Sequence, residues 1–398
     1  MPSGNADARD QRLYPGHHAG VSAGALRLIT DPAEFDDLLQ RLARESLVAV
    51  DTEAASFHRH RDRVYLLQLS NRTDTYLVDP LAVDGLPGFG DLLANPAIEL
   101  VFHDADYDLR LLGFEFGFRA ARLFDTRVAA QFLNEPGIGL AALLEKYIGV
   151  HPDKRFQRAD WSARPLPPAM LEYAAMDTRH LPVLRDILRE RLAGLGRLEW
   201  AEEECALLTA VRWPDAEPPE VAALSVKGAR ALSPRALAVF RELYVWRART
   251  ADGLDRAAFR IVGNETLFVL AERPPADVQA LGATRGMGRD IAERRGPEIL
   301  AAIRRGLAIP EEELPRFVRG PRHRPDPAFE ARMERLKAVR GDLVARLSLA
   351  PGVLAPNWLL ETIAREAPAT LEDLRGLIGI RRWQVGAFGP ELVKAIHA

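Results

Sequence analysis

The sequence has little cysteine and no long apolar run, and both absences exclude classes of protein. Cys205 is the one cysteine among 398 residues, which excludes an intrachain disulfide framework and a zinc site built on cysteines. No apolar stretch approaches the roughly 20 residues that a membrane-spanning helix needs. Residues 1–22 are polar and lack the apolar centre of a signal peptide. We therefore expect a cytoplasmic protein without a membrane partner, beginning with a flexible tail.

An excess of positive charge is also missing. Lysine and arginine number 53 against 56 aspartates and glutamates, which gives a net charge of −3. Without a general basic field, binding to nucleic acid would have to rely on local basic patches or on bound metal cations. The length allows two or three domains, each with its own core.

Two carboxylates follow directly after an apolar run. The stretch "SLVAVDTE" begins as a strand that is buried on both faces, and Asp51 and Glu53 come next. Residues two apart on a strand share a face, and two carboxylates about 4–6 Å apart repel each other by about 3–4 kcal/mol at an effective dielectric constant near 20. Either the strand ends and the acids reach water, or a cation holds them together.

A second acidic cluster, "HDADYDL", follows another apolar run at residues 98–103. Asp104 and Asp106 lie where a helix is expected to begin, so the pattern predicts that one of them caps it. Asp108 lies one turn inside that helix and precedes apolar residues. Taken alone, the segment indicates an ordinary capped amphipathic helix.

A third acid lies on the apolar face of a long helix. At helical spacing the core-facing stripe is Met170, Tyr173, Asp177, Leu181, Leu184 and Leu188. A carboxylate among leucines is unfavourable unless it meets a cation or hydrogen-bond donors, and an arginine or a backbone amide would also suffice. Pro182 removes the amide that would bond to the Thr178 carbonyl, so a break is expected just after Asp177.

Four acids from three separate segments can converge on one place, where divalent cations would offset their repulsion. Oxygen ligands without histidine or cysteine favour Mg²⁺ or Mn²⁺ over zinc. Two such ions suit in-line attack of water on a phosphodiester, one activating the water and the other stabilising the leaving oxygen.

The order of elements predicts a mixed sheet flanked by helices. After the strand at 46–50, segments 64–70 and 75–79 are separated by the turn "NRTD" and indicate a hairpin. Further helical segments follow up to about residue 212, alternating with short apolar pieces.

The rest of the chain is helical and contains an internal repeat. Residue identities recur 93 positions apart over about 60 positions, as in the "GPE" that begins at Gly296 and again at Gly389, which predicts two small domains of similar fold. The expected divisions are a tail at 1–22, an α/β domain at 23–212, a linker at 213–231, a helical domain at 232–308, a basic proline-rich linker at 309–327, and a helical domain at 328–398. The second linker is either solvated or a strap for a phosphate backbone.

The three acidic motifs resemble those of a known enzyme family. "VDTE", "HDADYDL" and "YAAMD" look like the motifs of the DEDD exonucleases, which have a ribonuclease-H-like fold. The position of Tyr173, four residues before Asp177, resembles the pattern of the DEDDy branch of this family. The stretch "DWSARPL" and the spacing of the motifs resemble the ribonuclease D family, and the two repeats resemble HRDC domains, which bind nucleic acid.

The resemblance implies a set of site residues. By it, the ligands of two divalent ions, Mg²⁺ or Mn²⁺, are Asp51, Glu53, Asp108 and Asp177. Tyr173 would bond to the attacking water and orient it.

Other residues follow less directly from the resemblance. Asp125 matches a family position that we expect to cap a helix. Many members carry an aromatic residue where this chain has Ala54, so Phe57 or His58 would have to stack on the terminal base, or stacking is weaker. The candidate phosphate contacts near "DW", which could equally be solvated charges, are Lys154, Arg158 and Arg164.

The function implied is a metal-dependent 3′→5′ exoribonuclease, acting as a monomer, that trims RNA 3′ ends, tRNA precursors among them, and releases nucleoside 5′-monophosphates. Structured RNA would be held by the HRDC-like repeats while its single-stranded 3′ end enters the acidic site. Two alternatives stay open: a DNA exonuclease of repair or proofreading, and a nucleic-acid-binding protein with a relic site. The intact ligand set argues against the second.

Overall fold

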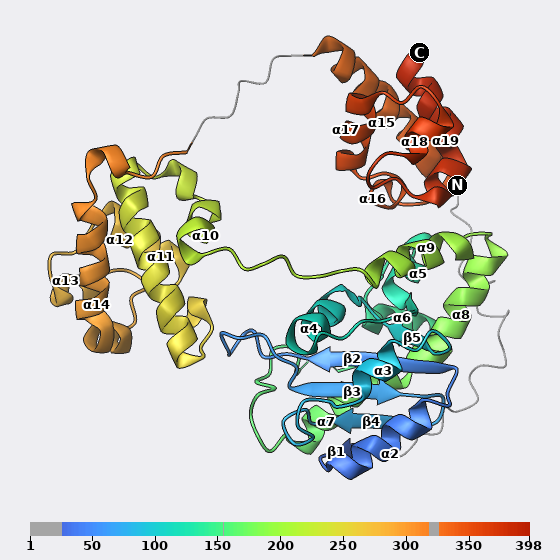
Figure 1. The fold of residues 1–398 in the computed structure, drawn as a ribbon, viewed down its shortest axis with the longest axis horizontal. Coiled ribbons are helices and arrows are strands. Elements are labelled where there is room, and N and C mark those ends of the chain that lie inside the picture. Colours follow the sequence, from blue (N-terminus) through green and yellow to red (C-terminus); the bar gives the residue numbers. More distant parts are fainter. Residues whose placement is uncertain (1–25, 154, 318–325) are drawn as a thin grey trace, which may run out of the picture. The chain divides into compact units, whose positions relative to one another are not determined.

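The computed structural model describes residues 26–153, 155–317 and 326–398, which form two compact units (Figure 1). The first unit comprises the described parts of Met1–Glu53, Val64–Arg212 and Arg324–Ala398, and the second comprises Ala54–Arg63 and Trp213–His323. Three predictions lie outside the described residues: the flexible tail, Lys154, and most of the basic linker's arginines.

The first unit contains a six-stranded mixed sheet (Figure 1). Its strands are β1 (Leu26–Ile29), β2 (Leu47–Glu53), β3 (Leu66–Ser70), β4 (Thr75–Val78), β5 (Glu99–Phe102) and β6 (Leu123–Asp125). They lie in the order β1-β4-β3-β2-β5-β6. The predicted hairpin is confirmed, since β3 pairs with β4 antiparallel, and the remaining pairs except β2–β3 are parallel. The mixed sheet is therefore as expected, while β1 and β6 were not predicted as strands.

Strand β2 does not end before its acids. Its apolar half is fully buried, and the ladder with β3 continues as far as Glu53, which pairs with Leu66. Asp51 stands opposite Gln68 in the same ladder. The two carboxylates therefore belong to the sheet rather than to a loop that follows it, and both side chains are partly buried.

Within the described residues of the first unit, eight helices accompany the sheet. They are α2 (Pro32–Leu42), α3 (Phe89–Leu93), α4 (Asp106–Phe116), α5 (Thr126–Phe132), α6 (Leu140–Ile148), α7 (Pro168–Arg179), α8 (Leu181–Gly194) and α9 (Leu198–Leu208). The predicted break is confirmed, because α7 ends and α8 begins on either side of His180, just before Pro182. No helix in the described part of the chain has the length and apolar character needed to cross a bilayer.

The internal repeat is visible in the helices of the two C-terminal domains. The first domain has α11 (Pro234–Leu254), α12 (Asn264–Glu272), α13 (Val278–Gly282) and α14 (Arg289–Ala308), and the second has α15 (Pro327–Leu347), α16 (Pro351–Leu354), α17 (Asn357–Glu366), α18 (Leu371–Arg375) and α19 (Arg382–His397). Even single hydrogen bonds recur: Arg247 donates to the Val262 carbonyl and Arg340 donates to the Ala355 carbonyl, each at 2.8 Å.

Part of the predicted linker 213–231 is structured. Helix α10 (Pro219–Ser225) and a 3₁₀ turn (Ala229–Ala231) lie within it, and Ala223 and Ala229 are fully buried in the core of the second unit. Two prolines of this segment, Pro218 and Pro219, stand at the start of α10, where a missing amide is tolerated.

The second unit also includes the segment that follows β2. Arg61 pairs with Asp252 at 2.9 Å, and the backbone amides of His60 and Arg61 donate to Asp255. Asp255 has a φ of 42° and ends α11, so its side chain joins the end of that helix to the segment Ala54–Arg63.

The second repeat packs against the α/β part of the first unit through α9 and α19. Trp383 stacks on Trp200 with ring centroids 4.9 Å apart, and Phe132 meets Trp383 edge-on at 5.2 Å. Glu203 accepts hydrogen bonds from the first two backbone amides of α19, at 2.8 and 3.0 Å, and Glu204 accepts one from the Trp383 indole at 3.1 Å. A carboxylate at a helix N-terminus also interacts favourably with the helix dipole.

Candidate active site

Three carboxylates converge at the end of β2. Asp51, Glu53 and Asp177 each offer an oxygen, and these oxygens lie within 4.8 Å of one another. Asp177 reaches β2 because α7 packs across β2, β3 and β4. The Ser70 hydroxyl on β3 lies 2.8 Å from the Thr178 hydroxyl on α7 and fixes the helix beside Asp177.

A fourth carboxylate, Asp108, is held close by through Thr52. The backbone amide of Thr52 donates to Asp108 Oδ1 at 3.1 Å, and the Thr52 hydroxyl donates to the same oxygen at 2.5 Å. Thr52 lies between the two acids of β2, so its side chain points to the opposite face of the strand from theirs. Asp108 is buried and stands outside the three-carboxylate group, with its orientation set through one of its two oxygens.

Burial raises the pKa values of all four acids, and repulsion from neighbouring site acids adds to this for Asp51 and Glu53. Burial is the main reason that the pKa of Asp51 lies well above its usual value, and the charges of Asp108, Asp177 and Glu53 raise it further. The pKa of Glu53 is raised in the same way. Burial raises the pKa of Asp108 and that of Asp177 to about 7. The cluster is thus unfavourable when fully ionised, unless a cation is bound.

Tyr173 lies one turn before Asp177 and is held between two aromatic rings. Phe156 meets it edge-on with ring centroids 5.8 Å apart, and Trp161 packs against it at 6.1 Å. Burial, followed by the charges of Asp177 and Glu53, raises the pKa of Tyr173 above its usual value. The phenol therefore stays protonated and keeps a hydrogen to donate.

Arg164 fastens the loop that carries Trp161 to the sheet. Its guanidinium bonds to the Asp79 carboxylate at 2.6 Å and to the carbonyls of Tyr65 and Trp161 at 2.6 and 2.7 Å. The sequence predicts Arg164 to be either a phosphate contact or a solvated charge. The structure instead gives its guanidinium partners within the protein.

The remaining predicted substrate residues are dispersed. Arg158 is exposed on the same loop, and Lys154 lies outside the described residues. Phe57 and His58 belong to the second unit, where Phe57 meets Phe259 edge-on at 6.0 Å.

The predicted caps of α4 require a correction. The N-cap of α4 is Ala105, without a side-chain cap, so neither Asp104 nor Asp106 caps the helix. Asp106 pairs with Arg110 one turn later, and Asp104 pairs with Arg127.

The cap predicted at Asp125 is confirmed. Its carboxylate accepts bonds from the amides of Arg127 and Val128 at the start of α5, and it also accepts from the amides of Asp104 and Ala105.

Sequence reasoning missed two residues at the site, Thr52 and Gln68. Thr52 was visible only as the middle residue of "DTE". Gln68 is fully buried opposite Asp51, with no hydrogen-bond partner for its amide within the described residues. The sequence did contain an indication of Gln68, because this residue is a lone amide in the apolar run "YLLQL".

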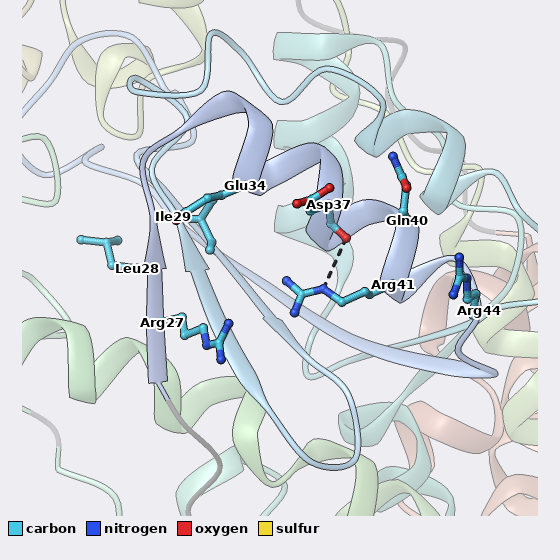
Figure 2. A pocket seen from close by; sticks show the side chains of 8 residues that line it. All are labelled: Arg27, Leu28, Ile29, Glu34, Asp37, Gln40, Arg41 and Arg44. Atoms are coloured by element: carbon cyan, nitrogen blue, oxygen red, sulfur yellow. Dashed lines mark hydrogen bonds between the residues drawn. The ribbon is translucent and has the colours of Figure 1, made fainter.

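A hollow elsewhere in the first unit does not belong to this site. It has a volume of about 680 Å³ and lies between β1 and α2, where Figure 2 shows Arg27, Arg41 and Arg44 beside Glu34 and Asp37. Two strands, β4 and β3, separate β1 from β2. Its charges are mixed, and we assign it no role in the chemistry.

The donor set at the end of β2 fits a hard metal cation. All of its ligand atoms are carboxylate oxygens, and a cation would remove the repulsion that raises their pKa values. Together with a protonated tyrosine one turn away, such a site can hold a cation and orient water beside it.

Comparisons with known proteins identify the domains of this chain. Residues 26–193 match the family described as 3′-5′ exonuclease, and residues 236–303 and 329–396 each match the HRDC domain. The two HRDC matches coincide with the internal repeat.

Whole-chain relatives have the same organisation. The ribonuclease D of Gluconacetobacter diazotrophicus is 35% identical over 371 residues, which covers 92% of this chain and 91% of that protein. The ribonuclease D of Granulibacter bethesdensis is 32% identical, covering 92% of this chain and 91% of its own length. The crystal structure of Escherichia coli RNase D matches with a TM-score of 0.68 and 25% identity, over 94% of this chain and 98% of that one. The chain therefore belongs to the ribonuclease D family of 3′–5′ exoribonucleases.

Proposed function

We propose that this enzyme trims the 3′ ends of structured RNA, tRNA precursors among them, in the cytoplasm and releases nucleoside 5′-monophosphates. The observation that carries the proposal is the convergence of the partly buried acids Asp51, Glu53 and Asp177, with buried Asp108 and a protonated tyrosine close by, in a chain of this family. The Escherichia coli relative is described as an exoribonuclease involved in structured RNA processing.

Asp51, Glu53, Asp108 and Asp177 would hold two divalent ions, Mg²⁺ or Mn²⁺. Carboxylate oxygens without nitrogen or sulfur ligands favour these ions. When bound, the ions would supply activation of water and neutralisation of the charge that develops on the phosphodiester oxygens.

The residues around the ions would position the reactants. The Tyr173 hydroxyl would bond to the attacking water and align it with the phosphorus atom, since its raised pKa keeps its proton in place. Phe156 and Trp161 restrict the tyrosine ring, and Arg164 restricts the loop of Trp161. Thr52 holds one oxygen of Asp108 and so restricts the orientation of that carboxylate.

Residues outside the carboxylate cluster would bind the RNA. The two HRDC domains would hold its structured part, as modules of this type bind nucleic acid. Arg158 and Lys154 are proposed to contact the phosphates of the single-stranded end, and Phe57 or His58 to stack on its terminal base. The exposed ring of Phe57 can serve in this way.

The test uses matched RNA and DNA, each labelled at the 5′ end and carrying a 3′ overhang, with Mg²⁺, Mn²⁺ or EDTA. A one-nucleotide ladder on RNA that EDTA abolishes, and that Asp51→Asn fails to produce, supports the proposal. Equal or faster degradation of the DNA would support a DNA exonuclease. A ladder that persists in EDTA would contradict a metal-dependent site.

A further inference from the structure

Gln68 is a polar side chain in the middle of an apolar strand. The residue is 0% exposed, and neither atom of its amide has a hydrogen-bond partner within the described residues. Its neighbours in β3, Leu67 and Leu69, are equally buried. A buried amide without a partner lowers the stability of a fold, so an apolar side chain of the same size would suit this strand better. Folding alone does not account for glutamine at this position.

The β-sheet register places this amide beside a predicted metal ligand. Gln68 stands directly opposite Asp51 in the antiparallel β2–β3 ladder. Opposed residues share a face, with Cβ atoms about 4.5–5.5 Å apart. Ser70, two residues further along β3, shares that face, and its hydroxyl contacts Thr178 of α7 at 2.8 Å. The Gln68 side chain therefore lies on the face that α7 covers, next to the helix that carries Asp177.

We propose that Gln68 is a positioning residue of the metal site: its amide N–H donates a hydrogen bond to the Asp51 carboxylate when that carboxylate holds a divalent cation. The inference rests on the proposed metal site and adds a residue to it. Carboxylates that bind metals are themselves usually hydrogen-bonded, and a bond to an ionised acceptor is stronger than one between neutral groups. Gln68 would do for Asp51 what Thr52 does for Asp108.

The test is Gln68→Met in the full-length chain, which keeps the length of the side chain and removes the amide. Mn²⁺ alone is titrated by calorimetry, and thermal unfolding is followed in EDTA. We expect the dissociation constant for Mn²⁺ to rise about 10- to 100-fold, as for other residues that bond to metal ligands. We expect the thermal midpoint in EDTA to stay the same or to rise, because the unpaired buried amide is gone.

Gln384→Met provides a matched control. Gln384 is also a buried glutamine, but its amide bonds to the Leu354 carbonyl and to the Arg381 amide, each at 2.8 Å. This variant should have a lower thermal midpoint and wild-type affinity for Mn²⁺. Asp51→Asn, run in parallel, reports whether the metal site itself is located as proposed.

The outcomes separate the two proposals. Unchanged Mn²⁺ affinity in Gln68→Met beside a clear loss in Asp51→Asn would overturn the role of Gln68 and leave the metal site standing. A lower midpoint for Gln68→Met in EDTA would also overturn it, since the amide would then have a partner in the metal-free fold. Equal, negligible binding by the wild type and Asp51→Asn would overturn the metal site, and the role of Gln68 with it.

Discussion

Tyr173 and Asp177 lie one helical turn apart on α7, yet their substitution should have different consequences. Tyr173→Phe keeps the ring between Phe156 and Trp161 and leaves all four acids in place. It removes only the hydroxyl proposed to align water, and a misplaced nucleophile costs about 10²-fold in rate. We expect kcat to fall by about that factor, with RNA affinity and Mn²⁺ titration nearly unchanged.

Asp177→Asn is the matched comparison for that experiment. It removes a negative ligand, so metal binding and cleavage should both fail, with partial rescue at high Mn²⁺ at most. Single-turnover cleavage and Mn²⁺ titration of both variants check the pair. A wild-type kcat in Tyr173→Phe would show that the tyrosine only packs the helix.

The raised pKa values of Asp108 and Asp177 also predict a pH dependence. The pKa of each of these two acids is about 7 in the folded chain, compared with an ordinary value of 3.8. Between these values the folded state binds more protons than the unfolded state, so stability decreases as pH rises. We expect the thermal midpoint in EDTA to fall from pH 5 to pH 8, because both acids lose their protons in that range.

Mn²⁺ should counter this loss, because it binds the ionised acids, and its affinity should increase over the same pH range. Asp177→Asn should show a shallower fall in EDTA than wild type. Thermal unfolding at fixed ionic strength checks both statements. A midpoint in EDTA that rises toward pH 8 would contradict them.

Elements with a clear local sequence pattern could be predicted, whereas elements that depend on tertiary contacts could not. The strand β2, the β3–β4 hairpin and the break before Pro182 each follow from local patterns. Strands β1 and β6 have only four and three residues and depend on pairing with β4 and β5.

The same limit applies to the candidate site. The four acids and Tyr173 could be named because their motifs lie within short segments. The hydrogen bonds that orient these side chains come from residues that are brought close only by folding, as Thr52 is to Asp108. The bonds of Arg164 could not be predicted for the same reason, since its partner Asp79 lies 85 positions away in the sequence.

The packing of α19 on α9 gives a prediction at the scale of elements. Trp383 is 5% exposed and contacts Trp200, Phe132 and Glu204. Replacing a buried tryptophan by alanine typically costs about 3–5 kcal/mol. Trp383→Ala should therefore lower the thermal midpoint and make the second HRDC domain more sensitive to protease.

Trp358→Ala is the control for this prediction. Trp358 lies in the same domain but is 50% exposed, so its loss should change stability much less. Equal effects of the two substitutions, in thermal unfolding and in limited proteolysis, would contradict a packed α9–α19 interface.

At the scale of the whole molecule, binding and cleavage should be separable. A chain that ends at Arg212 retains every proposed ligand and lacks both HRDC domains. We expect it to cleave short single strands in Mn²⁺ and to bind tRNA-like RNA more weakly than the full chain. Removing α19 uncovers Trp200, so the shortened chain should also self-associate more.

Filter binding at two salt concentrations and size-exclusion chromatography check this prediction. The substitution Asp51→Asn in both chains keeps the RNA intact during the binding measurement. If the shortened chain binds tRNA-like RNA as tightly as the full chain, the HRDC domains have another role.

The positions of the acids along the chain determine when the proposed site can form during synthesis of the protein. Asp51 and Glu53 are made first, Asp108 follows, and Asp177 comes more than 120 positions after Glu53, on a helix that must still pack across three strands. A nascent chain is attached to the ribosome, a machine built largely of RNA. Because the proposed site needs all four acids, the growing polypeptide would gain its cleavage activity only after Asp177 has been made and α7 has packed on the sheet.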